Sequence, residues 1–280
     1  MRIAYQGEPG AYSEAAALKF HASADALPRP SFDDVFSAVS SGTATHGILP
    51  VENSIGGSIH RNFDLLAEHD LSIVGEVELL VDHCLLAYPG TTRAALRRIY
   101  SHPQALAQCE QFLRTMSPRP GSGQGGVEIV ATYDTAGSAK LIRDGALKDT
   151  GAIASARAAE VFDLEVLASG IQDYAANLTR FVIVARQAET VSDADKTTIL
   201  FALPNEPGAL FKALSVFALR DIDLTKLESR PIRGRPWEYM FYVDLSVSRQ
   251  DMRCARALVH LAEFAKWVRT LGSYKRWKDT

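Results

Sequence analysis

The sequence predicts an α/β protein with two domains: a two-lobed α/β domain over residues 1–188 and a small α+β domain over residues 196–280. Short apolar strands alternate with helices through the first part, which is typical of sheets whose parallel strands are joined by helices. A polar, acidic stretch at 187–196 has no periodicity and indicates a linker. The order of elements changes after this linker, which indicates a second fold.

The composition fits this size and argues against several classes of function. The chain has 280 residues, of which 47% are hydrophobic, enough for two ordinary cores. A net charge of −3 gives no strong field, so we expect neither nucleic acid nor a membrane surface as a partner. No apolar run reaches the roughly 18 residues of a membrane span, and the first residues indicate a strand rather than a signal peptide. We therefore expect a cytoplasmic protein.

The first lobe is expected to open with a strand at 2–7 and to contain a clear amphipathic helix at 31–42. Phe32, Val35 and Val39 lie on one face of that helix, Ser31 is its expected N-cap, and a glycine follows its end. The other expected elements are a helix at 13–21 with Ser13 as its cap, a buried strand at 46–51 and a helix near 58–68.

A long extended run at 71–88, interrupted at 82–84, is expected to cross into a second lobe at about 80–160. The alternation of strands and helices continues there and predicts mostly parallel sheets. The expected elements are strands at 97–100, 127–133 and 151–155, helices at about 103–115, 135–145 (capped by Asp134) and 155–162, and a returning strand at 177–186. A glycine- and proline-rich loop is expected at 117–126.

The second domain follows the order strand, helix, strand, strand, helix, strand. That order is the ferredoxin-like βαββαβ unit. The expected strands are 197–203, 224–234, 237–247 and 267–276, and the expected helices are 205–221 and 251–265.

Motifs for cofactors, metals and covalent catalysis are absent. The sequence has no G-x-G-x-x-G after a strand, no phosphate-binding loop, no H-E-x-x-H and no G-x-S-x-G. Cys84, Cys109 and Cys254 fit neither a disulfide framework nor a zinc site and are expected to be buried thiols. We expect no cofactor and no metal, so any catalysis would depend on positioning and hydrogen bonding.

Small polar residues gather at four predicted strand ends, where ligands of open α/β sheets bind. Each cluster also has a purely structural explanation, such as a helix cap at Ser13 or an ordinary strand residue at Thr179. Their coincidence favours a site for a small anion, especially a carboxylate. The first cluster is Gly7, Gly10, Tyr12 and Ser13, and the second is Glu52, Asn53, Ser54, Gly56, Gly57 and Ser58. The third is Ser101, His102, Pro103 and Gln104, with Gln108 one turn further on, and the fourth is Asn177, Leu178, Thr179, Arg180 and Phe181.

Six stretches together resemble prephenate dehydratase with a C-terminal ACT regulatory domain. They are "YQGEPGAYSEAAA", "GILPVENSIGGSIHRNFDLL", "SHPQALAQC", "NLTRF", "NEPGALFKAL" and "ESRP". The resemblance implies a fold like that of periplasmic binding proteins, an active site between the lobes and no cofactor. It also implies a homodimer or homotetramer with an allosteric L-phenylalanine site between ACT domains.

The resemblance assigns roles to matching positions. It implies catalytic roles for Thr179, Asn53, Ser101, Glu52 and Gln108, and substrate binding by Arg180, Phe181, Ser13 and Ser54. It implies effector binding by Asn205, Gly208, Ala209, Leu210, Glu228, Ser229 and Arg230. Phe211 departs from the valine usual in the family, and we expect its ring to narrow the effector pocket.

The implied reaction is the conversion of prephenate to phenylpyruvate, with Thr179 donating a hydrogen bond to the leaving hydroxyl. Strand alternation cautions that Thr179 and Arg180 point to opposite faces. Glu52 would repel a dianionic substrate, so we expect it to orient Asn53 or bond the backbone. Two alternatives stay open: an arogenate dehydratase, and a sensor of amino acids without catalysis.

Overall fold

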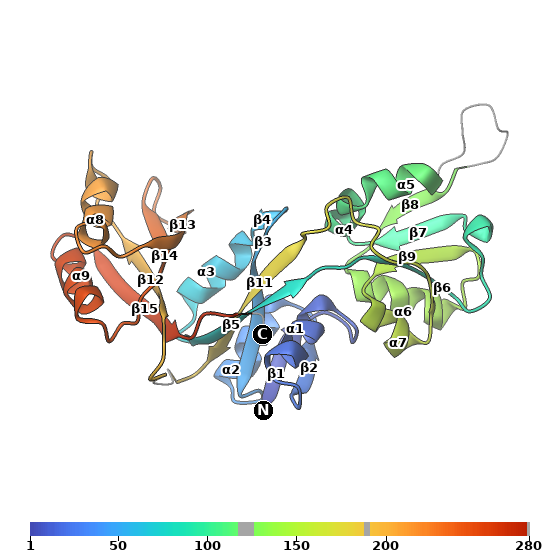
Figure 1. The fold of residues 1–280 in the computed structure, drawn as a ribbon, viewed down its shortest axis with the longest axis horizontal. Coiled ribbons are helices and arrows are strands. Elements are labelled where there is room, and N and C mark those ends of the chain that lie inside the picture. The colour runs from blue at the N-terminus through green and yellow to red at the C-terminus, as the bar shows by residue number, and fades with distance from the viewer. Residues whose placement is uncertain (117–125, 188–190, 279–280) are drawn as a thin grey trace.

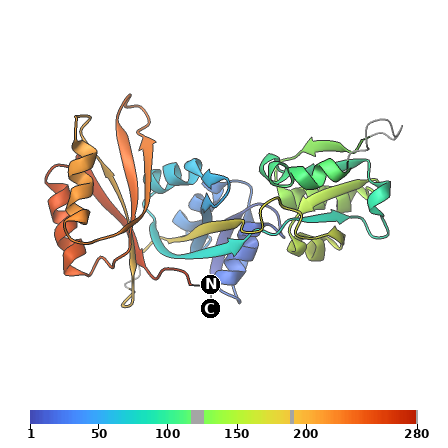
Figure 2. The same ribbon diagram turned by 45° about the horizontal axis from the view of Figure 1, so that its top comes forward.

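The computed structural model describes residues 1–116, 126–187 and 191–278. The chain forms three bodies in a row, with the first lobe in the centre, the second lobe at one end and the C-terminal domain at the other (Figures 1 and 2). The two-lobed layout expected from the sequence is therefore confirmed, and the gap between the lobes lies beside the centre of the molecule.

The first lobe is built on a sheet with strand order β2-β1-β3-β11-β5, and β4 pairs with β3. Its strands are β1 (Arg2–Gln6), β2 (Asp25–Arg29), β3 (His46–Asn53), β4 (Gly57–Ser58), β5 (Ser72–Leu80) and β11 (Leu178–Ala185). Its helices are α1 (Tyr12–Phe20), α2 (Phe32–Ser40) and α3 (His60–Glu68). The apolar face predicted for α2 is buried, because Val35 and Val39 are inaccessible to solvent.

Two segments cross between the lobes. The expected crossing at 71–88 is confirmed: β5 belongs to the first sheet, and β6 (Cys84–Ala87) belongs to the second. His83 lies at the break between these strands, and its backbone N–H donates to Gln172 Oε1 at 2.9 Å. Gln172 belongs to the returning segment that leads into β11, so the two crossings are bonded to each other.

The second lobe contains a sheet with strand order β10-β6-β9-β7-β8. Its remaining strands are β7 (Arg98–Ser101), β8 (Glu128–Ala131), β9 (Thr150–Ala154) and β10 (Glu165–Ala168). Its helices are the 3₁₀ turn η1 (Arg93–Ala95), α4 (Pro103–Gln108), α5 (Glu110–Met116), α6 (Thr135–Gly145) and α7 (Ala156–Phe162).

The sheets are mixed, which corrects the expectation of mostly parallel sheets. β1 runs parallel to β2 and β3, and β7 runs parallel to β8 and β9. However, β11 runs antiparallel to β3 and β5, and β6 runs antiparallel to β9 and β10. The cause is the double crossing, because the chain enters and leaves the second lobe in opposite directions.

The C-terminal domain contains a sheet with strand order β13-β14-β12-β15. Its strands are β12 (Lys196–Ala202), β13 (Leu224–Pro231), β14 (Tyr239–Leu245) and β15 (Trp267–Tyr274), and its helices are α8 (Ala209–Ala218) and α9 (Met252–Ala262). The predicted βαββαβ order is confirmed.

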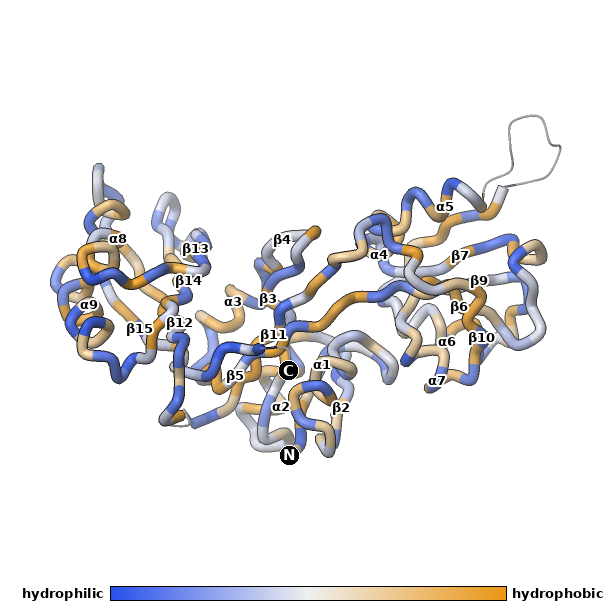
Figure 3. Tube along the Cα trace, in the orientation of Figure 1, coloured by the Kyte–Doolittle hydropathy of each residue, from blue (hydrophilic) through white to orange (hydrophobic). Residues whose placement is uncertain are grey.

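One face of this sheet packs directly on the first lobe. Tyr242 and Tyr274 are buried in one cluster with Phe63 and Ile73 of the first lobe. A Cβ atom at Gly272 would lie 1.9 Å from the carbonyl oxygen of Ile73, so only glycine lets β15 approach β5 this closely. Figure 3 shows apolar stretches along the strands of all three bodies and polar stretches along many outer loops.

Helix starts agree with the sequence at two places and differ at a third. Ser31 caps α2 by accepting the Asp34 N–H, and Asp134 caps α6 by accepting the Gly137 N–H. Ser13 does not cap α1, because the helix begins one residue earlier with Ala11 at the N-cap position.

Two predictions in the second lobe also differ from the structure or lie outside it. The helix expected at 103–115 is divided into α4 and α5, with Cys109 between them. The loop expected at 117–126 falls outside the described residues, except for Gly126.

Within the ranges 1–116, 126–187 and 191–278, no helix has the length and apolar content needed to span a membrane. In the same ranges, no group of three or more His, Cys, Asp or Glu side chains could hold a metal ion. Cys84, Cys109 and Cys254 are buried free thiols.

Candidate active site

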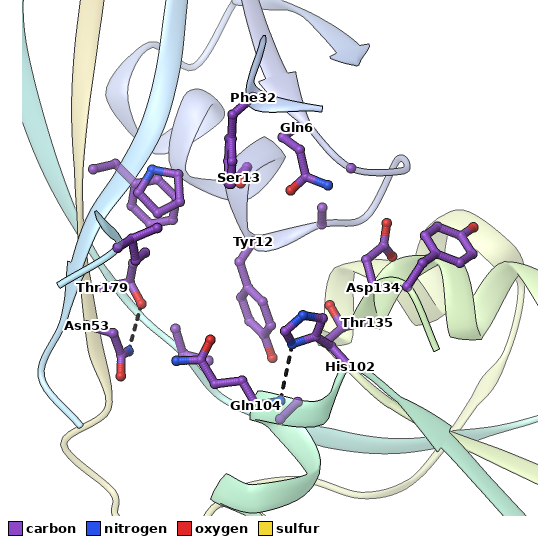
Figure 4. Close-up of a pocket in the computed structure, with 18 of the residues that line it drawn as sticks. Gln6, Tyr12, Ser13, Phe32, Asn53, His102, Gln104, Asp134, Thr135 and Thr179 are labelled. Atoms are coloured by element: carbon purple, nitrogen blue, oxygen red, sulfur yellow. Dashed lines mark hydrogen bonds between the residues drawn. The ribbon is translucent and has the colours of Figure 1, made fainter. Parts of the chain in front are cut away.

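A cleft with a volume of about 490 Å³ lies between the two lobes. The first lobe contributes the β1–α1 loop, the start of α2 and the ends of β3 and β11, and the second lobe contributes α4 and the start of α6. In Figure 4, side chains from both lobes point into this space, with Thr179 on one side and His102 and Asp134 on the other. A ligand in the cleft would therefore contact both lobes.

Asn53 and Thr179 form a hydrogen-bonded pair on the first-lobe wall of this cleft. They are cross-strand partners in the β3–β11 ladder, and the Asn53 Nδ2 donates to Thr179 Oγ1 at 2.9 Å. Both side chains line the cleft and are more than nine-tenths buried. Figure 4 shows this bond as a dashed line.

The orientation of the Asn53 amide follows from its other bonds. Its Oδ1 accepts the N–H of Ile55 at 3.1 Å and the N–H of Gly56 at 2.7 Å. The amide nitrogen must then face Thr179, since an amide oxygen cannot donate. Because the Thr179 oxygen accepts this N–H, the single hydroxyl proton is left to donate elsewhere. The pair thus presents an O–H donor beside the cleft.

A chain of polar side chains connects this pair to the second lobe. Asn53 Nδ2 also donates to Asn177 Oδ1 at 2.7 Å, and Asn177 Nδ2 donates to Gln108 Oε1 at 3.0 Å. The same Gln108 oxygen lies 2.9 Å from His83 Nε2, and His83 Nδ1 lies 2.9 Å from the Tyr12 hydroxyl. Gln108 therefore lies at the site.

His83 and Tyr12 belong to the site, although the sequence motifs assigned them no role. Burial lowers the pKa of His83 despite its hydrogen bond with Gln108, so the ring is neutral near pH 7. Burial likewise raises the pKa of Tyr12, which stays a protonated donor. The signal in the sequence for His83 is the polar interruption "DHC" within an apolar extended run, and Tyr12 stands in the cluster that follows the first strand.

The α1 end of the cleft offers donors to an anion. Ser13 lines the cleft, and its hydroxyl makes no hydrogen bond to another side chain or backbone group in the described part of the chain. The cap residue of α1 is Ala11, which has no side-chain oxygen, so the first-turn N–H groups receive no side-chain cap. Such a helix end attracts negative charge.

The lining contains few formal charges. Among the described residues that line the cleft there is no lysine or arginine, whereas Asp33 and Asp134 are present. Burial raises the pKa of Asp134, and hydrogen bonds from the backbone N–H groups of Gly137 and Glu8 oppose that rise. An anionic ligand must therefore be bound mainly by N–H groups, hydroxyls and histidines. Phe181 supplies an apolar part of the wall.

Arg180 and Glu52 do not line the cleft, and their expected roles are corrected. Arg180 points to the opposite face of β11, where it pairs with Glu52, Glu76 and Asp244. Glu52 neither orients Asn53 nor bonds the backbone, because its carboxylate accepts from Lys226 Nζ at 2.8 Å and from Arg180. The alternation of side chains along a strand explains both positions.

Ser101 and Ser54 also lie outside the cleft lining. Ser101 is fully buried at the end of β7 and donates to the Ile153 carbonyl at 2.6 Å. Ser54 donates to the Ala176 carbonyl and accepts the Leu178 N–H, each at 2.9 Å. Both hydroxyls form hydrogen bonds with neighbouring backbone groups, so they stabilise the local fold and do not face a ligand in the cleft.

Comparison with known proteins identifies the family. The family model described as prephenate dehydratase matches residues 3–189, and the model described as ACT domain matches residues 197–249. The chain belongs to the prephenate dehydratase family. Its C-terminal domain is an ACT domain, as the family resemblance had implied.

Curated relatives and solved structures agree with this assignment. "Arogenate dehydratase 1" of Petunia hybrida is 49% identical to this chain, and the match covers 98% of this chain and 66% of the relative. "Arogenate dehydratase/prephenate dehydratase 6, chloroplastic" of Arabidopsis thaliana is also 49% identical, and the match covers 98% of this chain and 68% of the relative. The chain thus spans about two thirds of these relatives.

Two solved structures resemble the whole chain. The prephenate dehydratase of Arthrobacter aurescens, solved in complex with L-Phe, is 31% identical over 99% of this chain and 90% of its own, with a TM-score of 0.88. A structure titled "GqqA- a novel type of quorum quenching acylases" is 37% identical, covers 99% of this chain and 98% of its own, and has a TM-score of 0.88.

The ACT domain has a small pocket of about 140 Å³. Its lining includes Asn205, Ala209, Leu210, Trp237, Tyr239 and Phe241. Gly208, beside them, has φ of +80° at the N-cap of α8, a conformation that favours glycine.

The second effector motif lies away from this pocket within the single chain. Glu228 accepts a hydrogen bond from Ser58 of the first lobe, and Arg230 pairs with Asp64 in α3. Ser229 is exposed on the outer face of β13. Phe211 is 77% exposed and does not line this pocket.

Proposed function

We propose that this chain catalyses the decarboxylating dehydration of prephenate to phenylpyruvate, a step of L-phenylalanine biosynthesis. The observation that carries the proposal is the Thr179 hydroxyl, oriented by Asn53 at the wall of the interlobe cleft of a prephenate dehydratase family member. The reaction needs a donor for a leaving hydroxyl, and this pair supplies one. No redox step and no acyl intermediate is required.

The reaction itself balances without a cofactor. The bond between the ring and its carboxylate breaks, and carbon dioxide leaves. The released electron pair makes the ring aromatic and expels the para hydroxyl, which leaves as water after it takes up one proton. Aromaticity supplies the driving force, so the barrier lies in the poor leaving group. A preorganised donor at that oxygen is worth on the order of 3 kcal/mol, about a hundredfold in rate.

Thr179 acts as this donor in the proposed mechanism. Threonine is too weak an acid to lose its proton outright, so it polarises the leaving oxygen while the proton comes from water or a neighbouring group. Ser101 is unsuited to relay that proton because its hydroxyl donates to the Ile153 carbonyl. Asn53 keeps the Thr179 oxygen occupied as an acceptor, so the O–H remains directed away from it.

The substrate carboxylates are bound, in this proposal, without an arginine. The uncapped start of α1 and the Ser13 hydroxyl bind the carboxylate of the pyruvyl side chain. The ring carboxylate sits without a strong cationic anchor. That suits the chemistry, because a group that loses its charge during the reaction must not be stabilised in the ground state.

Arogenate is the second candidate substrate, and one observation favours it. Asp33 and Asp134 line the cleft, and a carboxylate there could pair with the ammonium group that arogenate carries in place of the keto oxygen. The relatives named arogenate dehydratases agree with this alternative. The same Asn53–Thr179 pair would serve both reactions, since the leaving group is identical.

Amide hydrolysis, suggested by the name of one related structure, has less support. A nucleophilic threonine needs a general base within hydrogen-bonding reach. The Thr179 hydroxyl is bonded to the Asn53 amide, which cannot act as a base. The described contacts therefore favour a hydrogen-bond donor over a nucleophile.

Regulation by L-phenylalanine at the ACT domain is part of the proposal. The pocket beside α8 has the size of a small ligand, and the N-terminus of α8 can receive a carboxylate. The Arthrobacter aurescens relative was solved with L-Phe, which supports this effector. We further propose a homodimer or homotetramer in the cytoplasm, although several plant relatives are named chloroplastic.

A parallel assay tests the proposal. The purified protein is incubated with prephenate or with arogenate, and phenylpyruvate or phenylalanine is quantified against a protein-free control at the same pH. We expect turnover of prephenate that exceeds turnover of arogenate, and inhibition by added L-phenylalanine. A folded protein that converts neither substrate would contradict the proposed function.

A further inference from the structure

The strands that carry the catalytic pair present charged residues on their opposite face. In β3, Glu52 precedes Asn53, and in β11, Arg180 follows Thr179. Asn53 pairs with Thr179 across the ladder, and Glu52 pairs with Arg180. Because side chains alternate across a strand, one pair faces the cleft and the other faces the ACT domain.

Residues of the ACT domain bind both of these charged side chains. Lys226 Nζ donates to Glu52 Oε1 at 2.8 Å, and Arg180 Nη1 donates to Asp244 Oδ2 at 2.7 Å. Arg180 Nη2 also lies 3.3 Å from Glu52 Oε2. The side chains of Arg180, Lys226 and Asp244 are nearly buried, so little water competes for the bond between Arg180 and Asp244, whereas the Glu52 side chain is 38% exposed.

These contacts belong to a larger group that we call the interdomain charge cluster. Lys196 Nζ lies 2.7 Å from Glu76 Oε2 and 3.4 Å from Asp244 Oδ2. Lys226 Nζ lies 3.6 Å from Glu228 Oε2. The cluster consists of Glu52, Glu76, Arg180, Lys196, Lys226, Glu228 and Asp244. Buried ion pairs add little net stability but fix geometry, so a role in positioning is physically reasonable.

Strand β14 connects this cluster to the effector pocket. Tyr239 and Phe241 line the pocket on one face of the strand. Tyr242 and Asp244 lie on the other face, where Tyr242 donates to the Phe63 carbonyl and Asp244 binds Arg180. A ligand that shifts β14 at the pocket would therefore move the group that binds Arg180.

The β3–β11 ladder has a point at which such a shift can be absorbed. Arg180 pairs with Glu52 but Phe181 pairs with Pro50, so Val51 is an extra residue in β3 beside the Glu52–Arg180 pair. Regular pairing is interrupted at such a bulge, and bulges commonly aim side chains next to active sites. A displaced Arg180 side chain can then change the direction of the Thr179 hydroxyl without disrupting the sheet.

We propose that Lys226 and Asp244 of the ACT domain are positioning residues for the Asn53–Thr179 pair, acting through Glu52 and Arg180, and that ligand occupancy of the effector pocket reaches the cleft through this cluster. The inference rests on the proposed function, because catalysis is its readout. It gives Lys226 and Asp244, to which the sequence assigned no role, a defined place in the reaction.

The test compares two substitutions at the same interface. Lys226→Met removes the cation bound to Glu52 but keeps the apolar stem of the side chain. The matched control is Asp64→Asn, which breaks the bidentate pair between Arg230 and α3, with both N···O distances at 3.0 Å. Both changes remove one ion pair between β13 and the first lobe. Only the first touches a neighbour of the catalytic pair.

The two variants should differ in kcat rather than in folding. Misplacement of a catalytic group by a fraction of an ångström lowers the rate strongly, so Lys226→Met should reduce kcat about tenfold with KM changed less than about twofold. Lys226→Arg should restore most of this loss. Asp64→Asn should keep kcat within about twofold of the wild type, although its melting temperature should fall as much as that of Lys226→Met.

Regulation provides the second readout. L-phenylalanine should still bind Lys226→Met, as followed by calorimetry or by the fluorescence of Trp237 in the pocket lining. The bound effector should change kcat/KM by a smaller factor than in the wild type, because the coupling between the sites is weakened. In Asp64→Asn, both binding and inhibition should be retained.

Several results would overturn the inference. Wild-type kcat and inhibition in Lys226→Met would do so, and so would an equal loss of kcat in Asp64→Asn. If Lys226→Met does not fold, Lys226→Gln is combined with Glu52→Gln in a double-mutant cycle, and additive losses of kcat would contradict the coupling. A wild-type protein without turnover of either substrate contradicts the proposed function instead, so the two failures are distinguishable.

Discussion

Replacement of Asn53 by aspartate tests the orientation of the catalytic hydroxyl with almost no change in shape. The Asn53 Nδ2 donates to Thr179 Oγ1 at 2.9 Å, to Asn177 Oδ1 at 2.7 Å and to the Leu178 carbonyl at 3.2 Å. In Asn53→Asp, an oxygen faces these three acceptors. The Thr179 hydroxyl then turns its only proton toward the carboxylate, and the cleft loses its donor.

The expected size of the effect follows from these contacts. Loss of one preorganised donor costs about 2.7–4 kcal/mol in the transition state, which is a hundredfold to thousandfold decrease in kcat. The hydrogen bond with Thr179 is kept with its direction reversed, but the bonds to Asn177 Oδ1 and the Leu178 carbonyl are lost. At about 0.5–1.5 kcal/mol each, their loss lowers the free energy of unfolding by roughly 1–3 kcal/mol. The bonds that Oδ1 accepts from Ile55 and Gly56 remain, so the turn after β3 should persist.

The assay follows phenylpyruvate formation over a range of pH, with urea denaturation for stability. Protonation of the introduced carboxylate would recreate a donor toward Thr179, so the rate of Asn53→Asp should rise relative to the wild type as the pH falls. Asn53→Ala has no group to protonate and should show no such recovery. Wild-type kcat in Asn53→Asp throughout the pH range would refute the assigned orientation.

Three further predictions follow from other contacts. Gly10→Ala should lower the free energy of unfolding by about 1–3 kcal/mol and raise KM, because φ is +88° and the new Cβ would lie 2.7 Å from Ala158 Cα in the second lobe. Gly90 has a similar φ of +80° but open space around it, so Gly90→Ala should lower stability without affecting KM. Ser101→Ala should lower stability by about 1 kcal/mol and keep kcat within about threefold, and a hundredfold loss would restore Ser101 as a catalytic residue. Burial would raise the pKa of Glu52 and Asp244, but their cationic partners outweigh burial and lower both pKa values. The contribution of these carboxylates to stability is therefore complete above their unfolded pKa values of 4.5 and 3.8 and is lost as the pH falls below them. Melting temperatures that rise on acidification would contradict this.

The sequence was a good guide where side chains repeat with a clear period. The apolar stripe of α2 predicted a buried helix face, and the run at 71–88 predicted the crossing between lobes. The three strands that it did not predict, β2, β4 and β10, are short and lie at the edges of their sheets. β2 contains Pro28 and is only partly buried, so it lacks the alternation and the apolar run that mark an inner strand.

The site could be predicted only in part, because sequence motifs do not reveal which face of a strand meets which body. Asn53 and Thr179 were expected to meet, and they do. Glu52 and Arg180 belong to the same motifs, yet strand alternation turns them toward the ACT domain.

The contribution of the break between β5 and β6 could not be predicted, for a different reason. His83 is a single polar residue at a strand break, and its neighbours Tyr12 and Gln108 lie far away in sequence. Their contact depends on how the two lobes are placed, which local patterns do not specify. The interdomain charge cluster was missed for the same reason, because it combines residues from both domains.

The most direct test of the whole account is the turnover number of Thr179→Ser beside that of Thr179→Ala, measured on prephenate with equal amounts of folded protein. Serine keeps the hydroxyl and alanine removes it, so kcat should remain within about tenfold of the wild type in the first and fall at least about a hundredfold in the second. Wild-type turnover in Thr179→Ala would contradict the central claim that this hydroxyl assists the leaving group.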